Sequence, residues 1–182
     1  VVALDAQTGA IRWRVPLPTE PTSLAVAGDR LFLSGADGAL YSFRQTGDPK
    51  PAWRYRMLGA IGQPVMSERH VYFTLIDNTV RALDRKGGSQ RWSRQLPTRP
   101  ATGPILLGDA LVVPLTNGRV SYLSTANGAV GPAAEPSEAA SRLRLQAVAP
   151  SADGLTVFTI AAAGDDTRTL TAWRKRTGVP GL

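Results

Sequence analysis

The chain repeats one short motif about every 40 residues, and this period limits the possible folds more than any other feature of the sequence. The segment "ALDAQTGAIRW" at residues 3–13 returns as "ALDRKGGSQRW" at residues 82–92. Weaker copies align on one apolar position per repeat, and the last step is longer by about ten residues. These anchor positions are Leu4, Phe43, Leu83, Leu123 and Trp173. Such a period is typical of architectures in which every repeat forms one supersecondary unit.

Each repeat contains short apolar or alternating runs separated by turn residues. In the third repeat the runs are residues 61–67, 70–76, 79–85 and 89–96. They are rich in β-branched and aromatic residues, and no segment keeps the 3.6-residue apolar period of a helix. The second run is apolar almost throughout, which favours a central strand covered on both faces. We therefore predict an all-β chain, a β-propeller built from four-stranded antiparallel blades.

We expect one partial β-propeller over residues 1–182. Its approximate blades are residues 1–18, which supply the last two strands of a blade, then 19–59, 60–98, 99–133 and 143–182, with an inserted loop at 134–142. About four to five blades are present, and we favour part of a longer ring. Seven or eight blades are usual in the family that this chain resembles, so we expect a seven- or eight-bladed ring. An open half-ring would expose strand edges, so a missing half should cover them. The alternative is an unusually small ring whose two ends share one blade.

The pattern Ala-x-Asp-x-x-Thr-Gly-x-x-x-Trp, complete in residues 3–13, resembles the tryptophan-docking motif of the PQQ-like, BamB-like β-propeller repeat family. That family includes quinoprotein alcohol dehydrogenases, the outer-membrane assembly lipoprotein BamB and sensor domains of some bacterial kinases. The resemblance covers nearly the whole chain, although Pro132 replaces the tryptophan of the fourth repeat. It implies a structural, blade-docking role for Asp5, Thr8, Gly9, Trp13, Thr46, Gly47, Trp53, Asp84, Gly88, Trp92, Gly128, Thr177 and Gly178.

The chemistry of the motif supports docking independently of the resemblance. Asp5 follows a strand and can accept backbone N–H groups in an Asx-type turn. Gly9 can supply the positive φ that a tight hairpin needs. Trp13 is large enough to lie across the gap to the next blade, where its indole N–H needs a carbonyl partner. A motif that returns every repeat predicts a structural contact, and functional residues are expected where the repeats disagree.

Charge and composition narrow the possible partners. The formal net charge is +7 and cysteine is absent. A basic chain favours acidic partners, but the cations are spread along the sequence, and the tightest cluster, residues 174–176, is too short for a nucleic-acid site. We interpret the charge as a solvated basic surface and expect no nucleic-acid partner. No apolar run reaches the roughly 18 residues of a membrane helix, so membrane association would need an anchor outside this sequence.

The sequence offers little for catalysis. His70 is the single histidine, and it begins an apolar run beside charged residues, so we read it as a surface or blade-edge residue. The resemblance implies that a quinoprotein enzyme would need PQQ, calcium and typically a vicinal disulfide, and the chain has no cysteine. The acidic groups Asp165–Asp166, Glu135 and Glu138 read as solvated turn residues. We therefore predict no catalytic residue, no cofactor site and no metal site.

The resemblance implies a non-catalytic scaffold for protein–protein interaction in the bacterial cell envelope, similar to the assembly factor BamB. We expect a periplasmic or otherwise extracytoplasmic location, with other proteins as partners, including the missing half of the propeller. The insertion at residues 134–142 is a candidate contact element because it interrupts the repeat. A ligand-sensing propeller attached to a kinase or other receptor is the alternative, and part of a quinoprotein dehydrogenase is the third.

Overall fold

The computed structural model describes residues 1–46, 50–57, 59–131, 144–151, 156–162 and 168–174. Over these residues the chain forms sixteen strands in five antiparallel sheets. The first sheet pairs β1 (Val2–Leu4) with β2 (Ile11–Arg14). The second contains β3 (Pro21–Ala27), β4 (Arg30–Gly35), β5 (Ala39–Arg44) and β6 (Pro51–Arg56). The third contains β7 (Ala60–Met66), β8 (His70–Leu75), β9 (Thr79–Asp84) and β10 (Gln90–Gln95).

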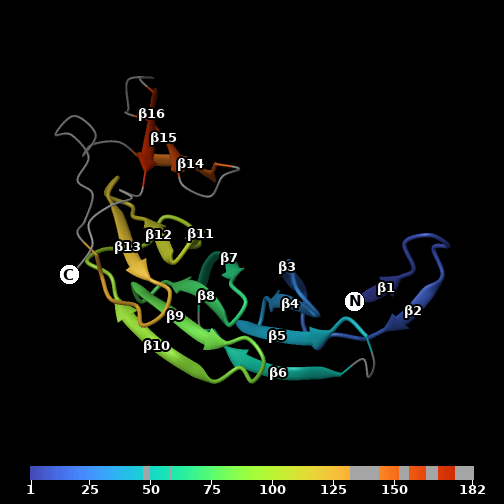
Figure 1. Ribbon diagram of the computed structural model, residues 1–182. Coiled ribbons are helices and arrows are strands. Elements are labelled where there is room, and N and C mark those ends of the chain that lie inside the picture. Colours follow the sequence, from blue (N-terminus) through green and yellow to red (C-terminus); the bar gives the residue numbers. More distant parts are fainter. Residues whose placement is uncertain (47–49, 58, 132–143, 152–155, 163–167, 175–182) are drawn as a thin grey trace.

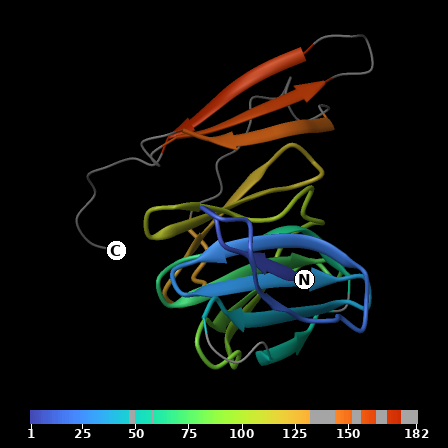
Figure 2. The same cartoon turned by 90° about the vertical axis from the view of Figure 1, so that its right-hand side faces the viewer.

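The remaining two sheets have three strands each. They are β11 (Ile105–Leu107), β12 (Ala110–Pro114) and β13 (Val120–Ser124), then β14 (Arg144–Pro150), β15 (Thr156–Ala162) and β16 (Arg168–Arg174). Figure 1 shows the sheets following one another in sequence order along an arc, with β6 and β10 on its outer side. Seen after a quarter turn, the β14–β16 sheet stands at the end of the stack (Figure 2). The arrangement is that of β-propeller blades, which confirms the predicted fold class.

The bounds of the strands follow the predicted runs closely. In the third sheet, β8 and β9 begin at the first residue of their predicted runs and end one residue before the last. The fourth sheet differs, because its outermost strand is reduced to a single bridge between Leu123 and Val130 within the described residues. Pro132, which stands in place of the motif tryptophan, lies outside them. Within the described residues, this sheet therefore ends in a single bridge just before the position where the motif tryptophan is replaced.

The core lies between the sheets, and each central strand contributes to two parts of it. Phe32 on β4 packs toward the third sheet, whereas Leu31 and Leu33 pack toward the first. The same alternation occurs on β8, where Tyr72 and Phe73 belong to different clusters. A strand with neighbours on both faces must be apolar on both, so the expectation of covered central strands is confirmed.

The inner strands connect neighbouring sheets. β7 contacts both β3 and β11, and Val157 on β15 is buried with Val112 on β12. Contacts between sheets thus run the length of the arc, from the first sheet to the last.

No helix long and apolar enough to cross a bilayer occurs in the described ranges.

Candidate functional site

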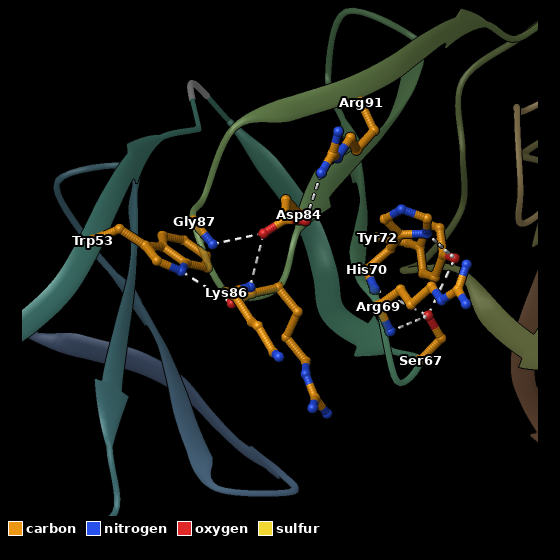
Figure 3. A network of polar contacts seen from close by, with 10 residues as sticks. Trp53, Ser67, Arg69, His70, Tyr72, Asp84, Lys86, Gly87 and Arg91 are labelled. Carbon is orange, nitrogen blue, oxygen red and sulfur yellow. Dashed lines mark hydrogen bonds and ion pairs between the residues drawn. The ribbon is translucent and has the colours of Figure 1, made fainter.

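Three tryptophans connect consecutive sheets through the same hydrogen bond. The indole Nε1 of Trp53, on β6, donates to the carbonyl oxygen of Arg85 at 3.0 Å (Figure 3). Trp92, on β10, donates to Thr125 at 3.3 Å, and Trp13, on β2, donates to Gln45 at 3.1 Å. Each bond crosses from the outer strand of one sheet to the turn after the third strand of the next. We call each such tryptophan, with the turn that receives it, a latch.

In two of the latches, a glycine packs against the tryptophan ring. Gly88 and Gly128 have φ of 73° and 70°. A Cβ at Gly88 would lie 2.6 Å from Cδ2 of Trp53, and one at Gly128 would lie 2.6 Å from Cε3 of Trp92. Any side chain at these positions would therefore collide with the indole ring and would also occupy a backbone conformation that favours glycine. Two demands, close approach and positive φ, select the same residue.

Aspartate closes the receiving turn. Asp84 Oδ1 accepts the backbone N–H groups of Lys86 at 3.0 Å and Gly87 at 2.6 Å, and Arg91 donates to Oδ2 at 2.8 Å (Figure 3). The ion pair with Arg91 and the N–H of Gly87 lower the pKa of Asp84. Asp84 therefore stays ionised at neutral pH and holds the turn that receives Trp53.

The first repeat has the same turn. Asp5 accepts the N–H of Thr8 at 2.9 Å and pairs with Arg12 at 2.6 Å. The backbone N–H of Thr8 and the side chain of Arg12 lower the pKa of Asp5 to about 2. The Thr8 hydroxyl also donates to Asp5 at 3.0 Å, a bond that the third repeat cannot make because Gly87 stands there. Gly9 has φ of 72°, like the glycines of the latches.

Of the remaining motif residues, the structure describes only Thr46. Thr46 is exposed at the end of the second sheet. Gly47, Thr177 and Gly178 lie outside the described residues, as does the insertion at 134–142. The contribution of the latches to blade docking stays a prediction, which the substitutions in the Discussion test.

A second repeated turn was not singled out from the sequence. Asp37, Asp77 and Asn117 each accept the backbone N–H of the residue two positions later, at 3.0–3.2 Å. The residue between has positive φ, and is glycine in two repeats and Asn78, with φ of 62°, in the other. These turns connect the second and third strands of the sheets. Their recurrence at the repeat period was the signal that could have found them.

A groove of about 1460 Å³ opens beside the latches of the third sheet. Its walls come from the β3–β4 turn, the β7–β8 and β9–β10 turns, and the segments around Leu106 and Asn127, so three successive sheets contribute. We call it the basic groove because its lining includes Arg69, Arg85, Lys86, Arg91 and Arg94. Only two carboxylates, Glu68 and Asp84, oppose these five cations. The groove therefore carries an excess of positive charge.

His70 lies at the edge of the basic groove and contacts a latch. Its Nδ1 is 3.2 Å from the hydroxyl of Tyr72 (Figure 3). That hydroxyl donates to the Thr125 carbonyl at 3.1 Å. Burial lowers the pKa of His70, and the charge of Arg91 lowers it further. At neutral pH the imidazole is uncharged. Its geometry is that of a packing residue at the blade edge.

The absence of a calcium or quinone site stays a prediction. In the part of the chain that the structure describes, no three His, Asp or Glu side chains converge as a metal would require. The acidic groups Asp165–Asp166, Glu135 and Glu138 lie outside that part.

Comparison with known proteins agrees with this arrangement. The family described as outer membrane protein assembly factor BamB matches residues 1–180. The chain is 28% identical to the BamB of Yersinia pestis over 146 residues, covering 70% of this chain and 37% of that protein. It is 26% identical to BamB of Bordetella pertussis over 141 residues, with coverages of 70% and 36%. The chain thus spans little more than a third of these relatives.

Among solved structures, the fold is similar to Hsv2 from Kluyvelomyces marxianus. The TM-score is 0.76 at 12% identity, and the match covers 98% of this chain and 54% of that one. At this identity the likeness concerns the fold alone.

Proposed function

Because this chain belongs to the family of the outer membrane protein assembly factor BamB, we propose that it is an extracytoplasmic, non-catalytic scaffold that binds other proteins during outer-membrane assembly. The observation that carries the proposal is the match of that family over residues 1–180. The use of the repeated residues supports it. The motif aspartates, glycines and tryptophans contact one another in the latches, which leaves the loops for partners.

We propose further that another part of the propeller covers the first sheet. Leu4 and Ile11 are more than half exposed there, and Gly9 has nothing within 4 Å of the position that a Cβ would take. In the occupied latches, the receiving carbonyl belongs to the residue after the position of the motif aspartate, which is Asp84 in the third repeat and Ser124 in the fourth. The equivalent carbonyl is that of Ala6, so a preceding blade would present a tryptophan N–H to Ala6 and its ring to Gly9.

A genetic complementation experiment tests the scaffold role. Deleting the gene from its native host should lower the amount of β-barrel proteins in the outer-membrane fraction, and plasmid-borne wild-type protein should restore it. The protein itself should fractionate with the cell envelope. Unchanged β-barrel protein levels after deletion, or recovery of the protein in the cytosolic fraction, would contradict the proposal.

A further inference from the structure

We propose that the basic groove binds an extended acidic segment of a partner polypeptide. The inference rests on the scaffold role proposed above and deepens it by giving the partner's chemistry. Its basis is the charge of the turns of the third sheet, together with the shape of the groove that this sheet shares with its two neighbours.

The position of Arg69 carries a different side chain in the two neighbouring sheets. The N–H of Arg85 donates to the carbonyl of Arg69, and the same backbone bond joins Gln45 to Asp29 in the second sheet. In the fourth sheet it joins Thr125 to Asp109. The backbone is therefore equivalent in all three sheets, but the position of Arg69 is aspartate in the other two. Because the backbone is unchanged, the fold does not need an arginine in place of aspartate at this position. We assign the change to recognition of a partner.

Two of these cations are available to a ligand. The side chains of Arg69 and Lys86 are exposed and have no polar partner among the described residues. Figure 3 shows Lys86 on the turn of Asp84 and Arg69 beside Ser67 and His70. The oxygens of Asp84 are already occupied by Arg91 and the turn N–H groups. The nearby carboxylate therefore does not neutralise the groove. Carboxylates of a partner would supply the missing acceptors.

Arg85 adds a third donor, partly held in place by the neighbouring sheet. Its terminal nitrogens lie 3.2 and 3.3 Å from the position that a Cβ would take at Gly28, in the β3–β4 turn. Its Nε is buried and has no hydrogen-bond partner among the residues that the structure describes. A buried guanidinium nitrogen without a partner is unfavourable, because the desolvation of a charged donor is not compensated. A bound acidic group near this turn would compensate it.

The dimensions of the groove favour a polypeptide. Small-molecule sites usually enclose roughly 300–1,000 Å³, and the 1460 Å³ groove is larger. Apolar side chains, among them Met66 and Leu106, also line the groove, and an extended peptide could pack on them. Single-stranded nucleic acid would need exposed aromatic faces, whereas Trp92 is only 7% exposed and its ring covers Gly128.

The test is a binding measurement on the full chain. The probe is a fluorescein-labelled peptide of alternating glutamate and valine, and fluorescence anisotropy gives the dissociation constant. The variant R69E/K86E reverses two groove charges, and we expect it to bind about tenfold or more weakly than wild type. The matched control R56E/R99E makes the same change in net charge at exposed sites. Arg56 ends β6, and the Arg99 carbonyl accepts from Thr116 by the β12–β13 turn, so both lie away from the groove.

The proposal predicts that the control binds within about twofold of wild type and that wild-type affinity falls as salt rises. Equal losses in R69E/K86E and the control would overturn it, because attraction would then follow net charge alone. It would also be overturned if anionic phosphatidylglycerol vesicles or a single-stranded oligonucleotide bound with the same dependence on Arg69 and Lys86 while the peptide did not. If R69E/K86E melts at a lower temperature than wild type, R69Q/K86Q replaces it under the same criteria.

The two proposals fail in different experiments. Loss of peptide binding in R69E/K86E concerns the groove and does not depend on where the protein works. The level of outer-membrane β-barrel proteins after gene deletion concerns the scaffold role. If deletion lowers that level and R69E/K86E binds peptide as wild type does, the groove assignment alone is wrong.

Discussion

Gly9 and Gly88 occupy the same position of the same turn, yet their surroundings are opposite. Their φ angles are 72° and 73°, and each follows an aspartate that accepts backbone N–H groups. Gly88 is covered by the ring of Trp53, whereas nothing lies within 4 Å of the Cβ position of Gly9. The turn therefore takes its shape from its own residues, with or without a docked tryptophan. Docking of a tryptophan is a separate requirement. It also favours glycine, because a Cβ at this position would collide with the ring.

The largest expected effect is the loss of a fully covered tryptophan. Trp92 is 7% exposed and packs with Tyr72, Leu111 and Leu123, whereas Trp13 is only partly buried. Trp92→Ala should lower the free energy of unfolding by about 3–5 kcal/mol, and Trp13→Ala should lower it by less. Urea denaturation followed by circular dichroism measures both. Losses below about 0.5 kcal/mol in Trp92→Ala would argue against docking.

The comparison of Gly9 with Gly88 can be tested by replacing each glycine with alanine. Gly9→Ala meets only the cost of alanine at positive φ, about 1 kcal/mol. Gly88→Ala meets that cost and also a contact of 2.6 Å with the Trp53 ring, so we expect about 2–4 kcal/mol in all. The difference between the two variants in urea denaturation isolates the docked ring. Equal losses would mean that the ring moves aside without cost.

The smallest expected effect is electrostatic and depends on pH. Asp5 and Asp84 have lowered pKa values in the folded protein, so the unfolded chain binds protons first as the pH falls. Their contribution to stability is present above the ordinary value of 3.8 and is lost as the pH drops toward about 2 for Asp5. The urea midpoint should therefore decrease below pH 4, and less steeply in Asp5→Asn. An identical slope in that variant would show that the turn makes no acid-sensitive contribution.

The sequence predicted the propeller, the third-sheet strands and the tryptophan positions because repetition makes local signals additive. It did not predict the basic groove. Arg69, Lys86 and Arg94 are far apart in the chain and looked like a dispersed, solvated surface. Antiparallel sheets place the first and third turns of every blade at one end, which gathers these cations. In the fourth sheet, the single bridge between Leu123 and Val130 within the described residues was indicated beforehand only by Pro132, which replaces the motif tryptophan.

The alternating side chains of β4, β8 and β12 also govern how the protein comes apart. Because each of these strands belongs to two cores, no inner sheet can open without exposing the faces of both neighbours. The sheets therefore behave as coupled units, and an inner sheet can open only at the cost of two interfaces. Amide hydrogen exchange should accordingly be slowest in β4, β8 and β12, whose residues pack into the cores on both faces.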